Sequence, residues 1–113
     1  MQVAVLGAGG HVGSRVLAAL AAAGASTQPI GRGVVPSAGG CGPLVNAAGC
    51  DGTVRASLLA ALAAGRDVVD LDRAAGHLAW AHEHAGTSAR EHGARLVPGA
   101  GLRWGIGDLL AAV

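Results

Sequence analysis

The sequence predicts an α/β fold with a doubly wound parallel sheet of about five strands and helices on both faces. Two observations predict it. A unit made of an apolar strand, a turn, an amphipathic helix and a terminating glycine recurs three times along the chain. The strand segments are apolar almost without alternation, which is typical of strands covered on both sides. The length of 113 residues fits one hydrophobic core, so we expect residues 1–113 to form a single domain.

Five strands and three main helices are expected. The strands cover residues 3–6, 27–30, 44–47, 68–71 and 95–97. The first two helices carry apolar residues at identical spacing, which places each set on one helical stripe: Val12, Val16, Leu17 and Leu20, and Val54, Leu58, Leu59 and Leu62. Each of the three helices ends where a left-handed glycine cap is expected, at Gly24, Gly65 and Gly93.

The third helix and two further segments are less regular. The third helix is expected over residues 74–92, where Gly86 costs about 1 kcal/mol relative to Ala. A last short helix is expected over residues 107–112, with Asp108 in its first turn, where a negative charge suits the helix dipole. Residues 33–43 are rich in Gly and Pro, and we interpret them as a loop that replaces a crossover.

Composition excludes several classes of function. The chain contains no Lys, Tyr or Phe, so it can supply no Schiff-base lysine, P-loop lysine or Tyr-Lys catalytic pair. Its eight Arg residues are scattered and nearly balanced by acids, which gives a net charge of +1 and no basic stripe for nucleic acid. The longest Ala/Leu stretches are interrupted before the ~18 residues that a membrane span needs. We therefore expect no nucleic-acid and no membrane partner.

The two cysteines indicate a cellular compartment. Cys41 and Cys50 form no CxxC pair, and no secretory signal precedes them. Free thiols are the simplest interpretation, because reducing compartments keep cysteines unpaired. We expect a cytoplasmic protein.

The first strand runs directly into a glycine-rich turn that opens the first helix. The turn reads GAGGHVG from Gly7 to Gly13. Gly7 permits a tight turn, Gly9 or Gly10 lets the backbone approach a pyrophosphate, and Gly13 lets the helix pack closely on the strand. The phosphates would meet the helix N-terminus beside His11 and Val12. This Rossmann-like context predicts dinucleotide binding, with a glycine turn that binds no ligand as the alternative.

The end of the second strand bears on the choice of cofactor. NAD-binding domains usually place an acidic residue there, about 20 residues after the glycines, to bond the ribose. This chain has Arg32 instead, and no acidic residue precedes Asp51. Arg32 suggests a 2′-phosphate and hence NADP rather than NAD. The alternative is that Arg32 is a solvated loop charge.

Four segments follow one another in a distinctive order: GAGGHVGSRVLAAL, LVNAAG, ASLLAALAAGRDVVDLD and AREHGARLVPGAG. In this order they resemble the NADP-binding domain of the saccharopine dehydrogenase family. The resemblance implies a single NAD(P)-binding Rossmann-like domain whose glycine turn holds the pyrophosphate. It also implies that Arg32 and the turn of Asn46, Ala47, Ala48 and Gly49 lie along the cofactor.

The resemblance implies an NADP(H)-dependent oxidoreductase, saccharopine being one substrate of the family. This chain departs from the family pattern after Gly49, where Cys50-Asp51 replaces Pro-Phe. The family's substrate domain is also missing, so we expect hydride transfer to need a homo-oligomer or a separate substrate-domain partner. No residue is assigned a catalytic role. A non-catalytic dinucleotide-binding regulatory module and a structural remnant are the alternatives.

Other polar residues admit structural interpretations. The histidines of the third helix, His77, His82, His84 and His92, are interpreted as surface residues, and no metal site is expected. Asp70 and Asp72 fall at the carboxyl end of a strand, where open α/β sheets bind ligands. We interpret Asp72 as a cap for the following helix and keep Asp70 as a candidate site residue. Trp80 and Trp104 are expected to pack at a subunit or domain contact.

Overall fold

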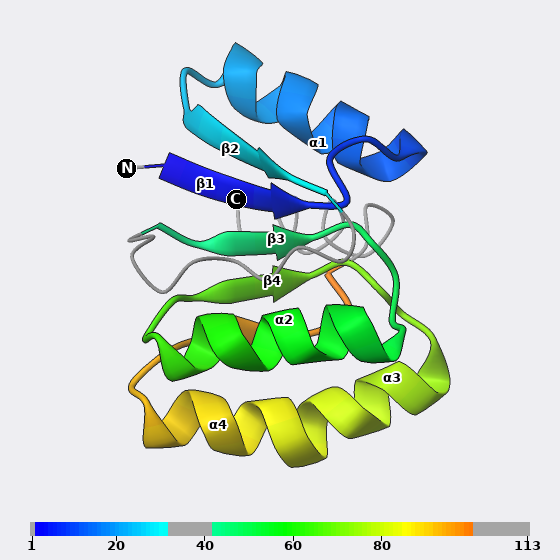
Figure 1. Ribbon diagram of the computed structural model, residues 1–113, viewed down its shortest axis with the longest axis vertical. Coiled ribbons are helices and arrows are strands. Elements are labelled where there is room, and N and C mark those ends of the chain that lie inside the picture. The colour runs from blue at the N-terminus through cyan, green and yellow to red at the C-terminus, as the bar shows by residue number, and fades with distance from the viewer. Residues whose placement is uncertain (1, 32–41, 101–113) are drawn as a thin grey trace, which may run out of the picture.

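Five parallel strands form the centre of the molecule in a computed structural model that describes residues 2–31 and 42–100 (Figure 1). The strands are β1 (Gln2–Leu6), β2 (Ser26–Ile30), β3 (Leu44–Asn46), β4 (Val68–Asp70) and β5 (Leu96–Val97). Their order across the sheet is β2-β1-β3-β4-β5, and all neighbouring strands are parallel. The predicted five-stranded sheet is confirmed, and each strand lies within one residue of its expected bounds.

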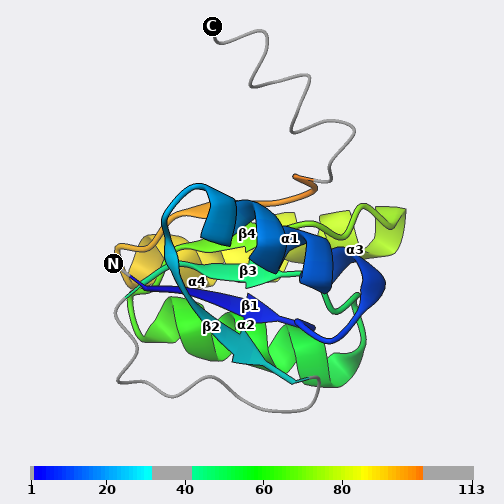
Figure 2. The same cartoon turned by 90° about the horizontal axis from the view of Figure 1, so that it is seen from above.

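Helices cover both faces of the sheet. Helix α1 (His11–Ala22) lies on one face and α2 (Gly52–Ala63) on the other (Figure 2). After β4 the chain forms one continuous helical segment made of α3 (Ala75–Trp80), the π-helical turn η1 (Ala81–Ala85) and α4 (Gly86–Glu91). Helix α4 packs against α2, so this segment extends the helical layer that α2 begins. None of the helices within residues 2–31 and 42–100 is both long and apolar enough to cross a membrane.

A left-handed glycine follows each helical segment. Gly24, Gly65 and Gly93 have φ of +80°, +76° and +66°. After the first of them, the N–H of Ala25 donates to the carbonyl of Leu20, and the residues that follow the other two glycines repeat this bond. These bonds satisfy carbonyl groups that a helix end leaves open. The three helix ends predicted from glycine are confirmed.

The hydrophobic core lies between the sheet and α2. Leu6, Leu44 and Val68 come from three adjacent strands and cluster with Leu58 and Leu62 of α2, and all five are fully buried. Burying a side chain of this size contributes about 1.5–3 kcal/mol. This core holds β1, β3 and β4 against α2, and the candidate site lies at the carboxyl ends of these three strands.

The opposite face, which carries α1, is less completely covered. Val5, Val45, Val69 and Val97 are register partners in one row across the sheet. Val5 is buried, the next two are half-buried, and Val97 is 51% exposed. Exposure rises along the row because α1 packs on β1 and β2, at one side of the sheet.

The predicted apolar stripe of α1 is therefore only partly buried. Val12 is 38% exposed, and Val16, Leu17 and Leu20 are half-buried. The matching stripe of α2 is much better covered, since it faces the core described above. Equal periodicity in the two helices thus does not give equal burial.

Several expectations fall outside the described residues. Arg32 and Cys41 lie there, as does the predicted loop 33–43 apart from Gly42 and Pro43. The predicted helix 107–112 and Trp104 also lie outside the described part of the chain.

Candidate functional site

The candidate site lies where the sheet reverses its winding. From β1 the chain passes through α1 to β2 on one side, whereas from β3 it passes through α2 to β4 on the other. Open α/β sheets bind ligands in the crevice that forms at the carboxyl ends of such neighbouring strands. Here that crevice lies between the turn after β1, residues 7–10, and the turn after β3, residues 46–49.

Gly7 and Gly13 are required by the fold itself. Gly7 has φ of +79°, and a Cβ on it would lie 2.7 Å from the Cα of Ala48. A Cβ on Gly13 would overlap the carbonyl oxygen of Gly7. The first glycine therefore allows the turn after β1 to approach the turn after β3, and the second allows α1 to pack against its own entry turn, as predicted.

Gly9 and Gly10 are not required by the fold in this way. A Cβ on Gly9 would have no atom within 4 Å, and one on Gly10 would meet only the Gly7 carbonyl oxygen, at 3.4 Å. Neither residue has a positive φ. Both line a pocket of about 370 Å³ whose other walls are Gly7, Gly31, Ala47 and Ala48, which we call the glycine pocket.

The N-terminus of α1 opens beside the glycine pocket without a side-chain cap. Its N-cap is Gly10, no side-chain cap bond is made by the part of the chain that the structure describes, and the first turn holds no acidic residue. At α2, by contrast, the Asp51 carboxylate accepts a bond from the N–H of Val54. An uncapped helix N-terminus presents N–H donors and a partial positive charge to an anion. The side chains of His11 and Val12 are exposed at this position.

The turn after β3 is shaped by the side chain of Asn46, which is fully buried. Its amide nitrogen donates to the Gly49 carbonyl and to Asp70 Oδ1, both at 2.9 Å, and its oxygen accepts from the Ala48 N–H. Gly49 has φ of +98°, which favours glycine. Asn46 therefore holds the turn, while Ala47 and Ala48 line the glycine pocket.

A second pocket opens on the other side of the same turn. It has a volume of about 220 Å³ and is lined by Val12, Asn46, Ala47, Gly49, Leu71 and Asp72; we call it the Asp72 pocket. Ala47 belongs to both pockets. The two pockets therefore flank one turn; Gly10, the N-cap of α1, lines the glycine pocket, and Val12 of α1 lines the Asp72 pocket.

The Asp70 carboxylate, kept as a candidate from its place at the end of β4, is fully buried beside the Asp72 pocket. It accepts bonds from Asn46 Nδ2 and from the Asp72 N–H, and its second oxygen bonds His77 Nε2. Asp72 itself accepts from the N–H of Ala74, the residue before α3. The expectation that Asp72 caps this helix is wrong: Ala74 is the N-cap, no side chain of the described residues caps the helix, and Asp72 instead closes a turn just before it.

The interpretation of His77 as a surface residue is wrong. Its side chain is buried, bonded to Asp70 on one ring nitrogen and to Arg55 Nε on the other, and stacked on Trp80. The other three histidines of the segment, at positions 82, 84 and 92, are exposed as predicted. Sequence spacing missed His77 because the residue that makes its burial possible, Asp70, belongs to a strand rather than to the helix.

Cys50 lies at the start of the turn into α2 and is half-buried. The Asp72 carboxylate raises the pKa of the Cys50 thiol, chiefly by charge repulsion of the thiolate, and burial and a hydrogen bond to Asp72 add to this. The thiol form is therefore favoured. Within residues 2–31 and 42–100, no group of three or more His, Cys, Asp or Glu side chains is placed to hold a metal ion.

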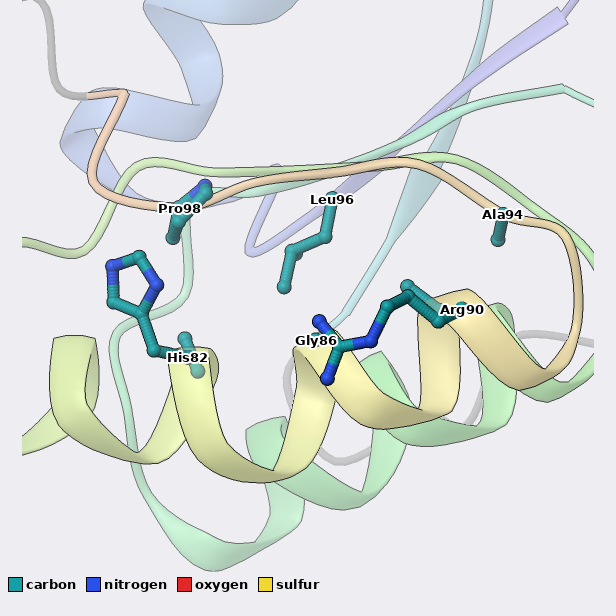
Figure 3. Close-up of a pocket in the computed structure, with 8 residues that line it drawn as sticks. His82, Gly86, Arg90, Ala94, Leu96 and Pro98 are labelled. Carbon is teal, nitrogen blue, oxygen red and sulfur yellow. The ribbon is translucent and has the colours of Figure 1, made fainter.

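A third pocket, of about 260 Å³, lies away from the glycine turn, between the η1–α4 helical segment and β5. His82 and Arg90 of the helix face Leu96 and Pro98 across it (Figure 3). Both polar side chains are exposed, and none of the predicted site residues lines this pocket.

The structure brings most of the predicted site residues together around one turn. Those that line the glycine pocket are Gly7, Gly9, Gly10, Ala47 and Ala48, and those that line the Asp72 pocket are Val12, Asn46, Ala47 and Gly49. Gly13 lines neither pocket. Comparisons of the chain with protein-family models, with curated proteins and with solved structures found no match.

Proposed function

We propose that this chain binds NADP(H) at the turn between β1 and α1. The pyrophosphate meets the N-terminus of α1, and the two nucleotide halves occupy the glycine pocket and the Asp72 pocket. Gly31, which lines the glycine pocket, directly precedes Arg32, so the adenosine half is assigned to that pocket and the nicotinamide half to the Asp72 pocket.

The observation that carries this proposal is the presence of glycine at positions 9 and 10. The fold needs Gly7 and Gly13, yet a Cβ at Gly9 would meet no atom within 4 Å and a Cβ at Gly10 would make only an ordinary contact with the Gly7 carbonyl oxygen. A glycine in an extended or turn conformation loses conformational entropy on folding and gains nothing from packing. Close approach of a ligand to the backbone explains why these two positions lack side chains.

The electrostatics of the glycine pocket favour an anion. The α1 N-terminus has neither a side-chain cap nor an acidic residue in its first turn. No acidic residue occurs before Asp51 in the sequence, so the two strands and the helix that surround the pocket carry no negative side chain. A pyrophosphate would supply acceptors for the open N–H groups and would suit the helix dipole.

The proposed activity is hydride transfer, as the resemblance to the saccharopine dehydrogenase family implies. Bound NADP(H) would supply the hydride or accept it, and this chain would bind and orient the dinucleotide. A separate substrate domain or a second subunit would bind the substrate. Because the chain lacks Lys and Tyr, a non-catalytic dinucleotide-binding regulatory module is the second candidate. Hydride transfer in the presence of a partner would separate the two.

Isothermal titration with NADPH tests the binding proposal. We expect saturable binding to the unaltered chain and binding at least about tenfold weaker in Gly9→Val and Gly10→Val, since each side chain would occupy the phosphate position. Gly52→Val is the matched control, because Gly52 also begins a helix, has open space around its Cβ and lines neither pocket. Absence of saturable binding at millimolar NADPH would refute the proposal.

Cofactor preference is tested separately. If Arg32 contacts the 2′-phosphate, Arg32→Ala weakens NADPH binding and leaves NADH binding almost unchanged. Equal affinity of the unaltered chain for the two cofactors would remove the assignment of NADP while leaving dinucleotide binding intact.

A further inference from the structure

The Asp72 pocket is bounded by two chain segments that one buried carboxylate holds together. Asn46, Ala47 and Gly49 form one wall, and Leu71 and Asp72 form the other. Asp70 Oδ1 accepts from Asn46 Nδ2 at 2.9 Å and from the Asp72 N–H at 3.1 Å, so a single oxygen atom bonds both walls. The N–H of Leu71 also donates to the Asn46 carbonyl at 3.1 Å, so the carboxylate adds a side-chain link to a main-chain bond between the same two walls.

His77 holds the carboxylate from its other side. Arg55 Nε, which can only donate, bonds His77 Nδ1 at 3.3 Å, so Nδ1 accepts and the ring proton lies on Nε2. Nε2–H then donates to Asp70 Oδ2. Three donors converge on the two oxygens of Asp70, and the Arg55 guanidinium lies on the far side of the imidazole.

Trp80 fixes the orientation of this chain of contacts. Its ring stacks on His77, with centroids 5.2 Å apart and planes inclined by 20°. The Arg55 guanidinium lies 5.0 Å from the Trp80 ring centroid, within the range of a cation–π contact. The imidazole is thus held by the indole and bonded at both nitrogens, and it has little freedom to rotate.

We propose that Asp70 and His77, supported by Arg55 and Trp80, are positioning residues that set the shape of the Asp72 pocket for the nicotinamide half of the dinucleotide. This assignment rests on the proposed function. A buried carboxyl group is unfavourable unless its oxygens are bonded, and apolar residues of similar volume would avoid that cost. Within residues 2–31 and 42–100, every Asp70 side-chain bond reaches either a wall of the pocket or His77.

The geometry predicts a selective effect. The carboxylate bonds both walls of the Asp72 pocket directly, whereas its link to the glycine pocket runs through Asn46, whose side-chain oxygen accepts from the Ala48 N–H. Breaking the bond between His77 and Asp70 should therefore weaken binding of the complete dinucleotide more than binding of its adenosine half. A residue that contributed only to stability would weaken both ligands equally or neither.

The experiment compares NADPH with adenosine 2′,5′-bisphosphate, which represents the adenosine half alone. His77→Phe keeps a ring on Trp80 but removes the donor to Asp70. We expect its NADPH dissociation constant to rise by about tenfold, as the loss of a buried charged hydrogen bond implies, and its bisphosphate constant to change less than about twofold. His77→Gln restores a donor and should recover part of the NADPH affinity. His82→Phe, at an exposed histidine of the same helical segment, is the control.

Arg55→Met provides a second test if His77→Phe does not fold, because Arg55 is half-buried and the methionine keeps an apolar stem over Trp80. We expect the same selectivity with a smaller factor. The positioning role would be refuted if the dissociation constants of both ligands changed by the same factor, or if His77→Gln did not restore NADPH affinity. Either result would leave dinucleotide binding established. Failure of the unaltered chain to bind either ligand would refute the proposed function and the positioning role with it.

Discussion

At the scale of single residues, the glycine turn contains two kinds of glycine. Gly7 and Gly13 lie where a Cβ would collide with backbone, whereas Gly9 and Gly10 border the glycine pocket. Stability and binding should therefore respond to different positions of the same motif.

Gly13→Ala should destabilise the fold, because its Cβ would overlap the Gly7 carbonyl oxygen at the start of α1. We expect a loss of about 2–4 kcal/mol and a melting temperature lower by roughly 10 °C or more. Gly9→Ala should melt within about 2 °C of the unaltered chain, since its Cβ meets no atom. Circular dichroism melting of both variants checks the contrast, and similar melting temperatures would contradict it.

Asp72 should control the reactivity of Cys50. Its carboxylate raises the pKa of the thiol, so removing the charge lowers that pKa and increases the thiolate fraction at a given pH. In a Cys41→Ser background, Asp72→Asn should speed alkylation by iodoacetamide several-fold at about pH 8. Asp67→Asn serves as a control for loss of a carboxylate that does not act on Cys50. An unchanged rate in Asp72→Asn would show that the repulsion is absent.

At the scale of elements, sequence periodicity and glycine placement predicted the strands and the helix ends. The reason is local: an apolar run between turns defines a buried strand, and a glycine in the left-handed region ends a helix whatever lies around it. Burial of α1 and the π-helical turn η1 could not be predicted in this way. The burial of α1 depends on how far across the sheet this helix reaches. The π-helical turn leaves no mark in the sequence, because no residue of Ala81–Ala85 breaks the ordinary helical pattern.

The candidate site shows the same division. The glycine turn is predicted by its contiguous motif, whereas the turn of Asn46 enters the prediction through the family resemblance alone. The bond between Asn46 and Asp70 joins residues 24 positions apart, and the burial of His77 depends on that pair. Contacts of this kind depend on which strands are neighbours in the sheet, and no short stretch of sequence specifies that order.

Alanine substitutions at Gly76 in α3 and at Gly93 after α4 should change the free energy of unfolding in opposite directions. Gly93 has φ of +66°, so Gly93→Ala should cost about 1 kcal/mol. Gly76 lies inside α3 with open space around its Cβ, so Gly76→Ala should stabilise the protein by up to about 1 kcal/mol. Urea unfolding of the two variants measures both, and a change of the same sign in each would contradict the assigned conformations.

The ion pair between β4 and β5 should give stability that depends on pH. Arg95 bonds Asp67 through its backbone N–H and its guanidinium, and the guanidinium bond chiefly lowers the pKa of Asp67. The pKa of Asp67 is lower in the folded chain than in the unfolded chain. The ion pair therefore contributes its full stabilisation at pH values above the unfolded pKa, and this stabilisation is lost as the pH falls through the folded pKa. Arg95→Gln should therefore be slightly less stable than the unaltered chain near neutral pH and equally stable in strong acid. Urea unfolding at both pH values checks this, and a constant difference would contradict it.

At the scale of the whole molecule, the proposed ligand would bind turns that follow four separate strands: β1, β2, β3 and β4. Unfolding separates these turns, so the ligand should bind the folded chain and not the unfolded chain. NADPH at about 100 times its dissociation constant should add about 2.7 kcal/mol of stability. Thermal melting with and without NADPH measures the shift, and Gly10→Val should abolish it. A shift that persisted in Gly10→Val would place binding elsewhere.

The strand order has a consequence for how the protein is made. In the order β2-β1-β3-β4-β5, every strand after the first pairs with a strand that precedes it in the sequence. On the ribosome, each newly emerged strand therefore finds its neighbour already synthesised, and none must wait for a later one. The sheet can be assembled in the direction of translation, which limits the time for which an unpaired strand is open to aggregation.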